Sequence, residues 1–483
     1  MTRAGKTALA AVLIAFGLAV APAASAGPVR ADRSATSARV TNGNPSGPGS
    51  FANAVQAANA DDGIGGIVFD PGLTATVPDS IVFTGAQRLS IDGNGSTVSG
   101  AGAEPDHTWD GGLFVSAGAS TAISIRGLTF ADSFNNGVAV LVPAGQEGVV
   151  QVTLREVTVE APQFHGVLVD AQETTGYNTD DIPHPSCVDP HPSDSPASVS
   201  VSLTDVTVTG AGTLDPGFDT SIETGCPQDF DGVRVDEGGE GSLTARIVGG
   251  HFDGNLADGI ELDESQSGTV AARVVGATFN GNGETMPVTY EGDTVVDLDD
   301  GFDIDETGPG GLIARFVNTE VIGNFDEGLD FDEAGSGDVD ALIVGTTAEG
   351  NEDENMKADE KDAGDLRFDV RSSSASMSAS QDGVQVEEAG DGDLVLSIRA
   401  STMRGNDGDG VRSDESDESD LVATVVNSDL SGNPGGSGTD IGEDGEGIGT
   451  VVITSTDLSG NGDGATTNDV DSEILRNNTL DAP

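Results

Sequence analysis

Acidic and basic side chains recur at fixed places in one short sequence pattern. The pattern is Asp-Gly, then alternating apolar and polar residues, then Asp-Glu, as in 231–237 and 300–306. If the copies lie side by side, Asp303, Asp330 and Lys357 become neighbours in one column. A pair of carboxylates can perform glycoside hydrolysis, and carboxylates with a basic residue suit proton abstraction. We therefore take these three as candidate catalytic residues, the alternative being a mixed-charge strand face without chemistry.

Arginines occupy two further columns of the same pattern. Arg234 is an outward position of the first strand-like run, and Arg246, Arg273 and Arg315 recur on the next run. Planar guanidinium groups bind carboxylates with two parallel hydrogen bonds, so stacked arginines could hold an anionic sugar chain. We assign these four to substrate binding. Ion pairing with neighbouring carboxylates of this acidic chain is the alternative.

The Asp of each closing Asp-Glu pair forms a third column. Stacked strands would place these carboxylates about 5 Å apart, and each like-charge contact costs roughly 1 kcal/mol in water. Counter-ions are therefore expected, and Ca²⁺ prefers six to eight oxygen ligands of this kind. A solvated acidic face adapted to high salt is the alternative. The candidate metal ligands are Asp236, Asp263, Asp305, Asp332, Asp359 and Asp414.

The composition restricts the class of protein. The 483 residues include 20 Lys and Arg against 82 Asp and Glu, which gives a net charge of −62. Nucleic acid is excluded as a partner, because phosphate binding requires a basic surface. A hydrophobic share of 36% is too high for a disordered chain. Cys187 and Cys226 both lie in Pro/Gly/Asp-rich stretches, and we expect a disulfide, with two free thiols as the alternative.

The repeat length determines the predicted fold. Eight copies of the pattern follow one another at spacings of 27, 42, 27, 27, 28, 27 and 28 residues. Three short alternating runs in about 27 residues leave no room for a helix, and the period is too short for a propeller blade. The sequence therefore predicts an all-β parallel β-helix of about a dozen coils. Loop insertions at 171–197, 211–229 and 283–298 are expected to wall a groove on one side.

Asparagines after a recurring Gly are expected to form a ladder at one turn of the solenoid. Each side-chain amide can donate to the coil on one side and accept from the other. The Gly-Asn pairs are 254–255, 281–282, 323–324, 350–351, 405–406, 432–433 and 460–461.

The N-terminal part divides into three segments ahead of the main solenoid. Residues 1–26 read as a secretory signal peptide, with a charged start, a short apolar run and an Ala-Ser-Ala end. Residues 27–39 are expected to be flexible, and 40–110 to form the cap and first coils. The β-helix proper is assigned to 111–483. Residues 50–59 form the capping helix, since Ser50 is a good N-cap and its apolar residues share one face.

The opening of the chain resembles a known family. Val40-Thr41-Asn42, Gly47-Pro48-Gly49-Ser50-Phe51, Ile67-Val68-Phe69-Asp70-Pro71 and Ile125-Arg126-Gly127-Leu128 look like the start of secreted bacterial right-handed parallel β-helix proteins with the pectate-lyase-like fold. The entry helix departs from that pattern, with Phe51–Val55 in place of Leu-Arg-x-Ala-Ile. The resemblance implies a secreted protein associated with polysaccharide or a cell surface. It supplies no catalytic residues.

These observations favour a secreted, acidic, cation-stabilised solenoid that binds extracellular polysaccharide or a cell-surface partner without catalysis. A Ca²⁺-dependent polysaccharide lyase or glycoside hydrolase acting on acidic polysaccharide is the alternative. We expect an extracellular monomer with no membrane span and no nucleic-acid partner.

Overall fold

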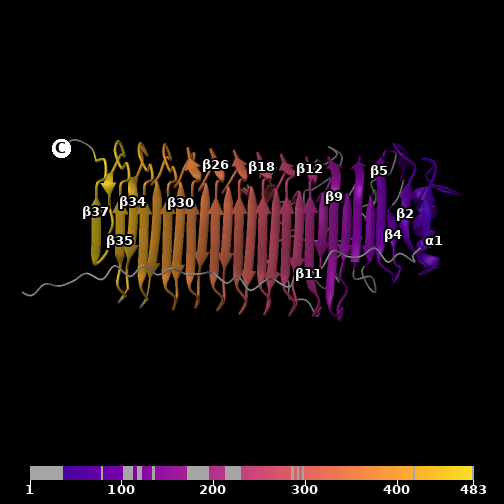
Figure 1. The fold of residues 1–483 in the computed structure, drawn as a ribbon, viewed down its shortest axis with the longest axis horizontal. Coiled ribbons are helices and arrows are strands. Elements are labelled where there is room, and N and C mark those ends of the chain that lie inside the picture. The colour runs from indigo at the N-terminus through magenta and orange to yellow at the C-terminus, as the bar shows by residue number, and fades with distance from the viewer. Residues whose placement is uncertain are drawn as a thin grey trace, which may run out of the picture. The chain divides into compact units, whose positions relative to one another are not determined.

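The protein is a parallel β-helix in which each coil adds a strand to two long sheets (Figure 1). The computed structural model forms one compact unit from Thr36 onward. The residues that it describes are 36–77, 80–101, 112–116, 122–132, 136–170, 195–212, 230–283, 288–290, 293–295, 298–416, 419–445 and 447–480.

The first sheet contains thirteen parallel strands, one from each coil, which confirms the prediction of about a dozen coils. Its strands are β4 (Ile81–Phe83), β6 (Leu113–Ser116), β8 (Val138–Leu141), β10 (Val167–Asp170), β13 (Val233–Glu237), β16 (Ile260–Ser265), β21 (Phe302–Thr307), β24 (Leu329–Glu333), β27 (Met356–Glu360), β30 (Val384–Ala389), β32 (Val411–Ser416), β34 (Ser437–Glu443) and β36 (Gly464–Thr466).

The second sheet contains twenty-two strands, because most coils contribute a longer strand and a short one after a bend. Its strands are β1 (Thr36–Val40), β2 (Ile64–Phe69), β3 (Thr74–Thr76), β5 (Leu89–Ser99), β7 (Ala122–Ala131), β9 (Val149–Glu160), β11 (Ser198–Thr204), β12 (Thr207–Thr209), β14 (Leu243–Val248), β15 (His251–Asp253), β17 (Val270–Val275), β18 (Thr278–Asn280), β22 (Leu312–Val317), β23 (Glu320–Ile322), β25 (Val339–Val344), β26 (Thr347–Glu349), β28 (Leu366–Arg371), β29 (Ser374–Ser376), β31 (Leu394–Arg399), β33 (Leu421–Val426), β35 (Thr450–Thr454) and β37 (Ser472–Arg476).

The bend between the longer and the shorter strand is made by one residue with left-handed backbone. Gly276 follows β17 with φ 66°, and Asn318 follows β22 with φ 52°. Gly and Asn adopt this conformation at the lowest steric cost. The first coils differ, because β5, β7 and β9 run through the bend as single strands of 10 to 12 residues.

A helix covers the N-terminal end of the solenoid, as the sequence predicts. Helix α1 is Phe51–Ala60, and the Ser50 hydroxyl accepts a hydrogen bond from the Asn53 amide at 3.2 Å. Phe51 is buried and its ring lies 5.1 Å from that of Phe69. Strand β1 differs from the expectation, because it occupies the end of the segment 27–39 that was predicted to be flexible. It pairs in parallel with β2, so backbone pairing orders it.

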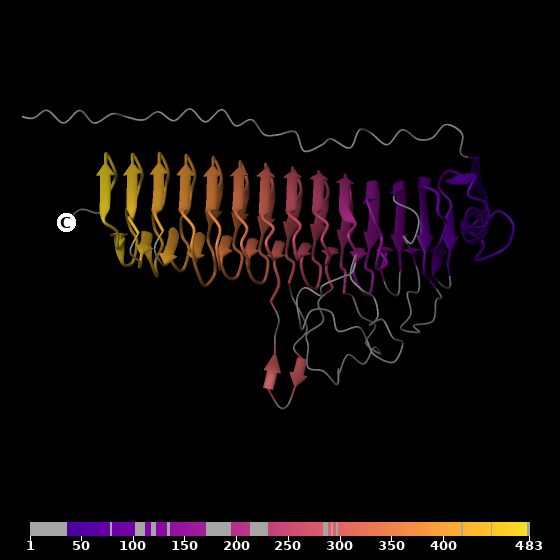
Figure 2. The same cartoon turned by 90° about the horizontal axis from the view of Figure 1, so that it is seen from below.

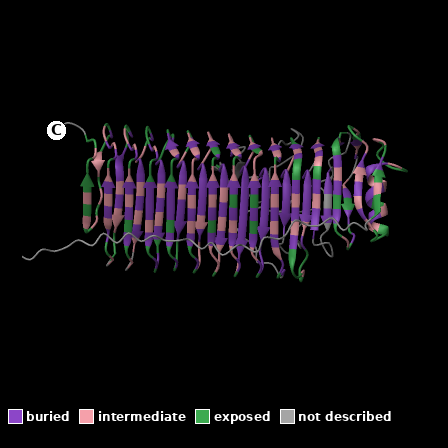
Figure 3. Cartoon of the chain, in the orientation of Figure 1, coloured by how far each residue is buried: buried purple, intermediate pink, exposed green. Residues whose placement is uncertain are grey.

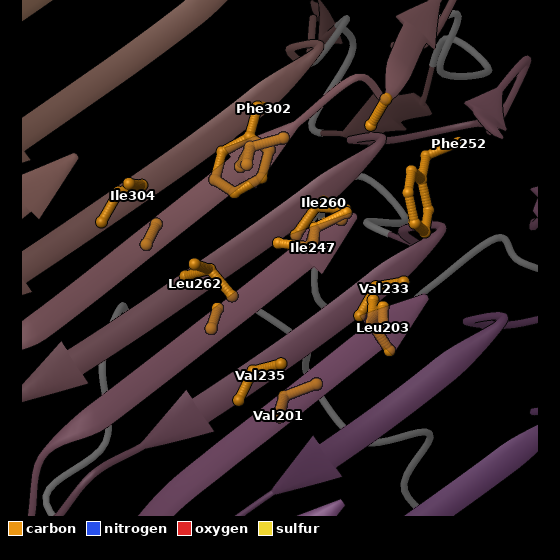
Figure 4. Packing of buried hydrophobic residues seen from close by; sticks show 14 of the residues in the cluster. Val201, Leu203, Val233, Val235, Ile247, Phe252, Ile260, Leu262, Phe302 and Ile304 are labelled. Carbon is orange, nitrogen blue, oxygen red and sulfur yellow. The ribbon is translucent and has the colours of Figure 1, made fainter. Parts of the chain in front are cut away.

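Small aliphatic side chains stack in register to form the core, which explains how a chain with 4% aromatic residues buries an interior. Val233, Ile260 and Phe302 form one such column (Figure 4). A chain of phenylalanines adds to it, with Phe279 to Phe302 ring centroids 5.2 Å apart and Phe302 to Phe316 5.0 Å apart. Figure 3 shows buried residues along the strands, whereas β37 at the C-terminal end is largely exposed.

The predicted asparagine ladder is present and buried. The side-chain amide nitrogen Nδ2 of Asn255 donates to Oδ1 of Asn282 at 3.0 Å. In the same way Asn282 donates to Asn324 at 3.1 Å, and Asn324 donates to Asn351 at 2.9 Å. We call these residues, with Asn406, Asn433 and Asn461, the asparagine column. Ser378 interrupts the series. Asn355 bridges the gap by accepting from Asn351 and donating to Asn406, at 2.9 and 3.3 Å.

The spacing of 42 residues contains an inserted hairpin. Strands β19 (Val288–Tyr290) and β20 (Asp293–Val295) pair antiparallel within the predicted insertion 283–298, and they stand off the solenoid (Figure 2). The predicted signal peptide, Cys187, Cys226 and most of the insertions 171–197 and 211–229 lie outside the described residues. The disulfide therefore stays a prediction, as does a groove walled by the three insertions.

Candidate functional site

Outward side chains of β21, β24 and β27 bring the three candidate catalytic residues together. Asp303 and Asp330 are opposite each other in the register of β21 and β24. The Lys357 ammonium lies 2.7 Å from Asp330 Oδ2 and 3.0 Å from Glu327 Oε1. Asp303 and Asp330 point outward because side chains alternate along a strand, and the inward positions on either side are occupied by Phe302, Ile304, Leu329 and Phe331.

Acidic residues in the turn that precedes each first-sheet strand complete this cluster. Asp300 joins Asp303 and Asp330 in a group in which one oxygen of each carboxylate lies within 4.8 Å of the other two. Three further groups of this kind are Asp231/Asp258/Glu261, Asp300/Asp326/Glu327 and Glu327/Asp353/Glu354. We call these four groups the acidic clusters. These turn residues were not predicted as ligands, although Asp231, Asp258, Asp300 and Glu327 each directly precede the Gly of the repeat.

The acidic clusters contain only carboxylate oxygen, which matches the preference of Ca²⁺. Asp330 is 8% exposed, and its Oδ1 atom is buried without a hydrogen-bond donor among the described residues. Such an atom is costly unless a cation or proton meets it. Buried acidic clusters of this composition could bind a metal ion, and the ligands would be Asp300, Asp303 and Asp330.

Burial also changes the ionisation of these groups. It raises the pKa of Asp300, Asp303 and Asp330 well above the usual value, and the neighbouring carboxylates raise the pKa further. The pKa of Asp326 rises to about 8, first because of burial and then because of Glu327. The cluster is therefore a site where like charges are held together at a cost that a bound cation would relieve.

Lys357 is held in its charged form. Burial by itself lowers the pKa of the Lys357 ammonium, but Asp330, Glu327 and Asp332 together outweigh burial and raise the pKa above its ordinary value. A lysine must lose its proton before it can act as a general base. The arrangement therefore disfavours Lys357 as the base of a lyase and suits an ion-pairing role.

The Asp column predicted to bind metal lies on the same outward face, at the other end of the strands. Asp332 pairs with the Lys361 ammonium at 2.7 Å, and Asp414 pairs with Arg412 at 3.0 Å. Within the described residues, no member of this column belongs to one of the four acidic clusters. The members are Asp236, Asp263, Asp305, Asp332, Asp359 and Asp414.

Arg234 is enclosed by carboxylates. It is 5% exposed, and its guanidinium lies 2.9 Å from Asp236 and 2.6 Å from Asp263 and pairs with Glu261. This corrects the expectation of an outward arginine displayed to a substrate. Four acidic residues surround one arginine here, since Asp231 lies 3.6 Å away, so the guanidinium serves the internal charge balance.

The arginines predicted on the second sheet form an in-register column. Arg246 pairs with Arg273 in the ladder of β14 and β17, and Arg273 pairs with Arg315 of β22. Arg315 forms an ion pair with Asp340 of β25. Arg246 and Arg273 are exposed, and neither forms an ion pair within the part of the chain that the structure describes.

A groove farther along the same sheet carries three more arginines, which were not predicted as site residues. It has a volume of about 510 Å³ and is lined by β28, β31 and β33. Arg371 donates to Asp369 at 2.9 Å, and Arg399 donates to the Ser397 hydroxyl at 2.9 Å. Arg367 lies 3.8 Å from Asp369, so one carboxylate serves two arginines. We call Arg367, Arg371 and Arg399 the arginine groove.

Comparisons with known proteins concern the fold alone. Neither a protein-family model nor a curated protein matches the chain. Among solved structures, the periplasmic alginate epimerase AlgG is 11% identical, with 83% of this chain and 78% of that chain covered and a TM-score of 0.36. The catalytic domain of a GH87 alpha-1,3-glucanase in complex with nigerose is 12% identical, with 91% and 69% covered and a TM-score of 0.40.

The A-module of the mannuronan C-5 epimerase AlgE6 from Azotobacter vinelandii is also 12% identical, with 90% and 94% covered and a TM-score of 0.35. Similarity at this level describes architecture, which the strand pairing already establishes. Separately, no helix among the described residues has the length and apolar character to cross a bilayer.

Proposed function

We propose that this protein is an extracellular binding solenoid that holds an acidic polysaccharide on the outer face of its second sheet. The observation that carries the proposal is the arginine groove. In a chain with 20 basic and 82 acidic residues, three arginines share one groove with a single aspartate. A polyanion would be repelled by most of the surface and attracted here.

The proposal extends along the sheet to Arg246 and Arg273. These exposed guanidinium groups lie in adjacent coils, about 4.8 Å apart along the solenoid. A linear polysaccharide presents carboxylates at a regular repeat, so a row of arginines suits it better than an isolated charge. The acidic clusters of the first sheet would hold Ca²⁺ and stabilise the fold, without contact to the sugar.

Affinity measurements on the full chain test this proposal. We expect binding to acidic polysaccharides and weak binding to neutral ones, with affinity that falls as salt rises. The double variant Arg367→Ala/Arg399→Ala should lose about tenfold or more in affinity. Arg412→Ala is the matched control, because Arg412 pairs with Asp414 on the opposite sheet and should leave binding unchanged. Equal loss in both variants would contradict the groove assignment.

Glycoside hydrolysis is the second candidate function, favoured by the proximity of Asp303 and Asp330. Hydrolases use two carboxylates, one protonated and one ionised, and burial, which raises the pKa of both residues, favours the protonated form that a general acid needs. New reducing ends from any polysaccharide, lost in Asp303→Asn, would establish it. Unsaturated products would instead indicate a lyase. Lys357 is poorly suited to be the base of a lyase, because its ammonium is held in the charged form.

A further inference from the structure

A second acidic column points into the solenoid rather than out of it. Strand alternation places the last residue of the repeat, Glu, on the same side as the buried valines and leucines. Each glutamate pairs in register with the next across seven successive ladders. The members, which we call the glutamate column, are Glu237, Glu264, Glu306, Glu333, Glu360, Glu388, Glu415 and Glu443.

The interior members of this column are removed from water. Glu264 and Glu333 are 0% exposed, and Glu306 and Glu388 are 1% exposed. Within the described residues, none of these four forms an ion pair with a basic side chain. A buried ionised carboxylate without a partner costs several kcal/mol, so a stack of them demands positive charge from another source.

Hydrogen bonds from the turn meet only part of this demand. The Gly337 amide donates to Glu333 Oε1 at 3.0 Å, and the Gly239 amide donates to Glu237 Oε1 at 3.3 Å. The amides of Gly268, Gly310 and Gly390 approach Glu264, Glu306 and Glu388 in the same way, but neither carboxylate oxygen of these three glutamates has a hydrogen bond of normal geometry. These six oxygens face the neighbouring glutamates, which are acceptors as well when ionised.

Backbone carbonyl oxygens of the adjacent turn converge on the same positions. A Cβ placed on Gly268 would lie 1.6 Å from the Gly241 carbonyl oxygen and 2.0 Å from Glu264 Oε1. A Cβ on Gly310 would lie 1.7 Å from the Gly268 carbonyl oxygen and 2.5 Å from Glu306 Oε1. A carbonyl oxygen of one coil and a carboxylate oxygen of the next therefore both lie against the glycine, and a side chain at this position would displace them.

We propose that the glutamate column binds divalent cations, with Ca²⁺ as the fitting ion, between successive coils inside the solenoid. The ligands are glutamate carboxylates and turn carbonyls, a set of hard oxygen donors that suits Ca²⁺. A proton shared between two carboxylates would form a hydrogen bond with one oxygen of each, but it would provide no positive charge or donor for the carbonyl oxygens. Charge balance sets one ion for every two glutamates. These ions are distinct from any ion held by the acidic clusters on the outer face.

The test is calcium counting on the full chain at pH 8, after removal of cations with a chelator and dialysis against Ca²⁺. Glu306→Gln is the column variant, because Gln keeps the shape and removes the charge. Asp303→Asn/Asp330→Asn is the matched variant on the outer face. We expect Glu306→Gln to bind at least one Ca²⁺ fewer than the wild type. The outer variant should keep the column ions, so failure of one site is distinguishable from failure of the other.

Terbium luminescence supplies a second readout that needs no variant. Tb³⁺ replaces Ca²⁺, and its lifetimes in H₂O and D₂O count the water molecules on the ion. An ion in the column should carry almost no water, because the glutamates are buried, whereas an ion on the outer face should be hydrated. The proposal is overturned if Glu306→Gln leaves the Ca²⁺ count unchanged, or if every bound Tb³⁺ of the wild type is hydrated.

Discussion

The asparagine column and the glutamate column occupy two corners of the same coils, and both are stacked in register and buried. They differ in one chemical respect. An asparagine side chain can donate to one neighbour and accept from the other, as Asn282 does between Asn255 and Asn324. An ionised glutamate only accepts. The asparagine column is therefore complete in itself, whereas the glutamate column is complete only with cations or protons. Stacking identical residues therefore satisfies the hydrogen bonds of asparagine, whereas it adds up the unfavourable charge of glutamate.

The largest expected effect is the response to pH in cation-free protein. Burial is the main cause that raises the pKa of Glu237 to about 7, of Glu306 to about 8 and of Glu388 to about 9. Because these values lie above those of the unfolded chain, the folded state binds more protons, and stability falls as pH rises. It should be highest below about pH 4.5 and be lost progressively as pH passes through 7 to 9.

Denaturant unfolding across this pH range, with and without Ca²⁺, measures the effect. The loss summed over the column should amount to several kcal/mol without Ca²⁺, and Ca²⁺ should remove most of it at pH 8. The asparagine column does not titrate and should contribute nothing to the slope. Stability that is flat from pH 4 to pH 9 in chelator would contradict the comparison.

The next largest effect should come from placing a carboxylate in the asparagine column, which makes it resemble the glutamate column. Asn324→Asp replaces a group that donates to Asn351 at 2.9 Å with an acceptor and buries a charge. We expect a loss of about 3 to 5 kcal/mol in the free energy of unfolding near neutral pH. Asn427→Asp is the control, because it makes the same chemical change at an exposed asparagine. It should change stability by less than about 0.5 kcal/mol.

The reverse exchange should change sign with the cation. In chelator at pH 8, Glu306→Gln removes a buried charge and supplies donors to Glu264 and Glu333, so we expect stabilisation of about 1 kcal/mol. With Ca²⁺ present, the same variant loses a ligand and should be less stable than the wild type. Paired thermal unfolding curves provide the measurement, and a shift of the same sign in both conditions would count against the cation column.

The smallest effect should come from an exposed column of like charges. Arg273→Ala interrupts the stack of Arg246, Arg273 and Arg315, yet Arg246 and Arg273 are exposed and Arg315 is paired with Asp340. We expect the free energy of unfolding to change by less than about 0.5 kcal/mol. Affinity for an acidic polysaccharide should fall, measured on the same sample. A large stability change would mean that exposed and buried charge stacks do not differ as argued.

Much of the fold was predictable because it depends on local patterns that repeat. The spacing of 27 residues predicts the coils, Ser50 predicts the start of the capping helix, and the Gly-Asn pairs predict the asparagine column. The convergence of Asp303, Asp330 and Lys357 was also predictable, since in-register stacking aligns equivalent positions. Repetition turns a one-dimensional period directly into neighbours in space.

Other features required coordinates. Arg234 was expected on the surface, but carboxylates of its own and the next coil enclose it. The arginine groove was not predicted, although Arg371 and Arg399 pair in register one repeat apart, because Arg367 comes from another position of β28 and only the fold shows that the three line one groove. The sequence did contain a signal for the glutamate column, because Glu237 follows Val233 and Val235 at alternate positions and alternate residues of a strand face the same side. The paired Asp-Glu obscured that signal, since Asp points outward and Glu inward.

The sequence by itself determined the architecture, the length of the coil and which side chains share a column. Hydrogen-bonded strands stack at a fixed spacing and side chains alternate, so these properties depend only on order along the chain. Only the tertiary structure decided which columns are buried, which charges find partners and where carbonyl oxygens approach carboxylates. Those properties depend on how the corners of neighbouring coils pack, and the electrostatic cost of a carboxylate is set by its surroundings rather than by its position in the repeat.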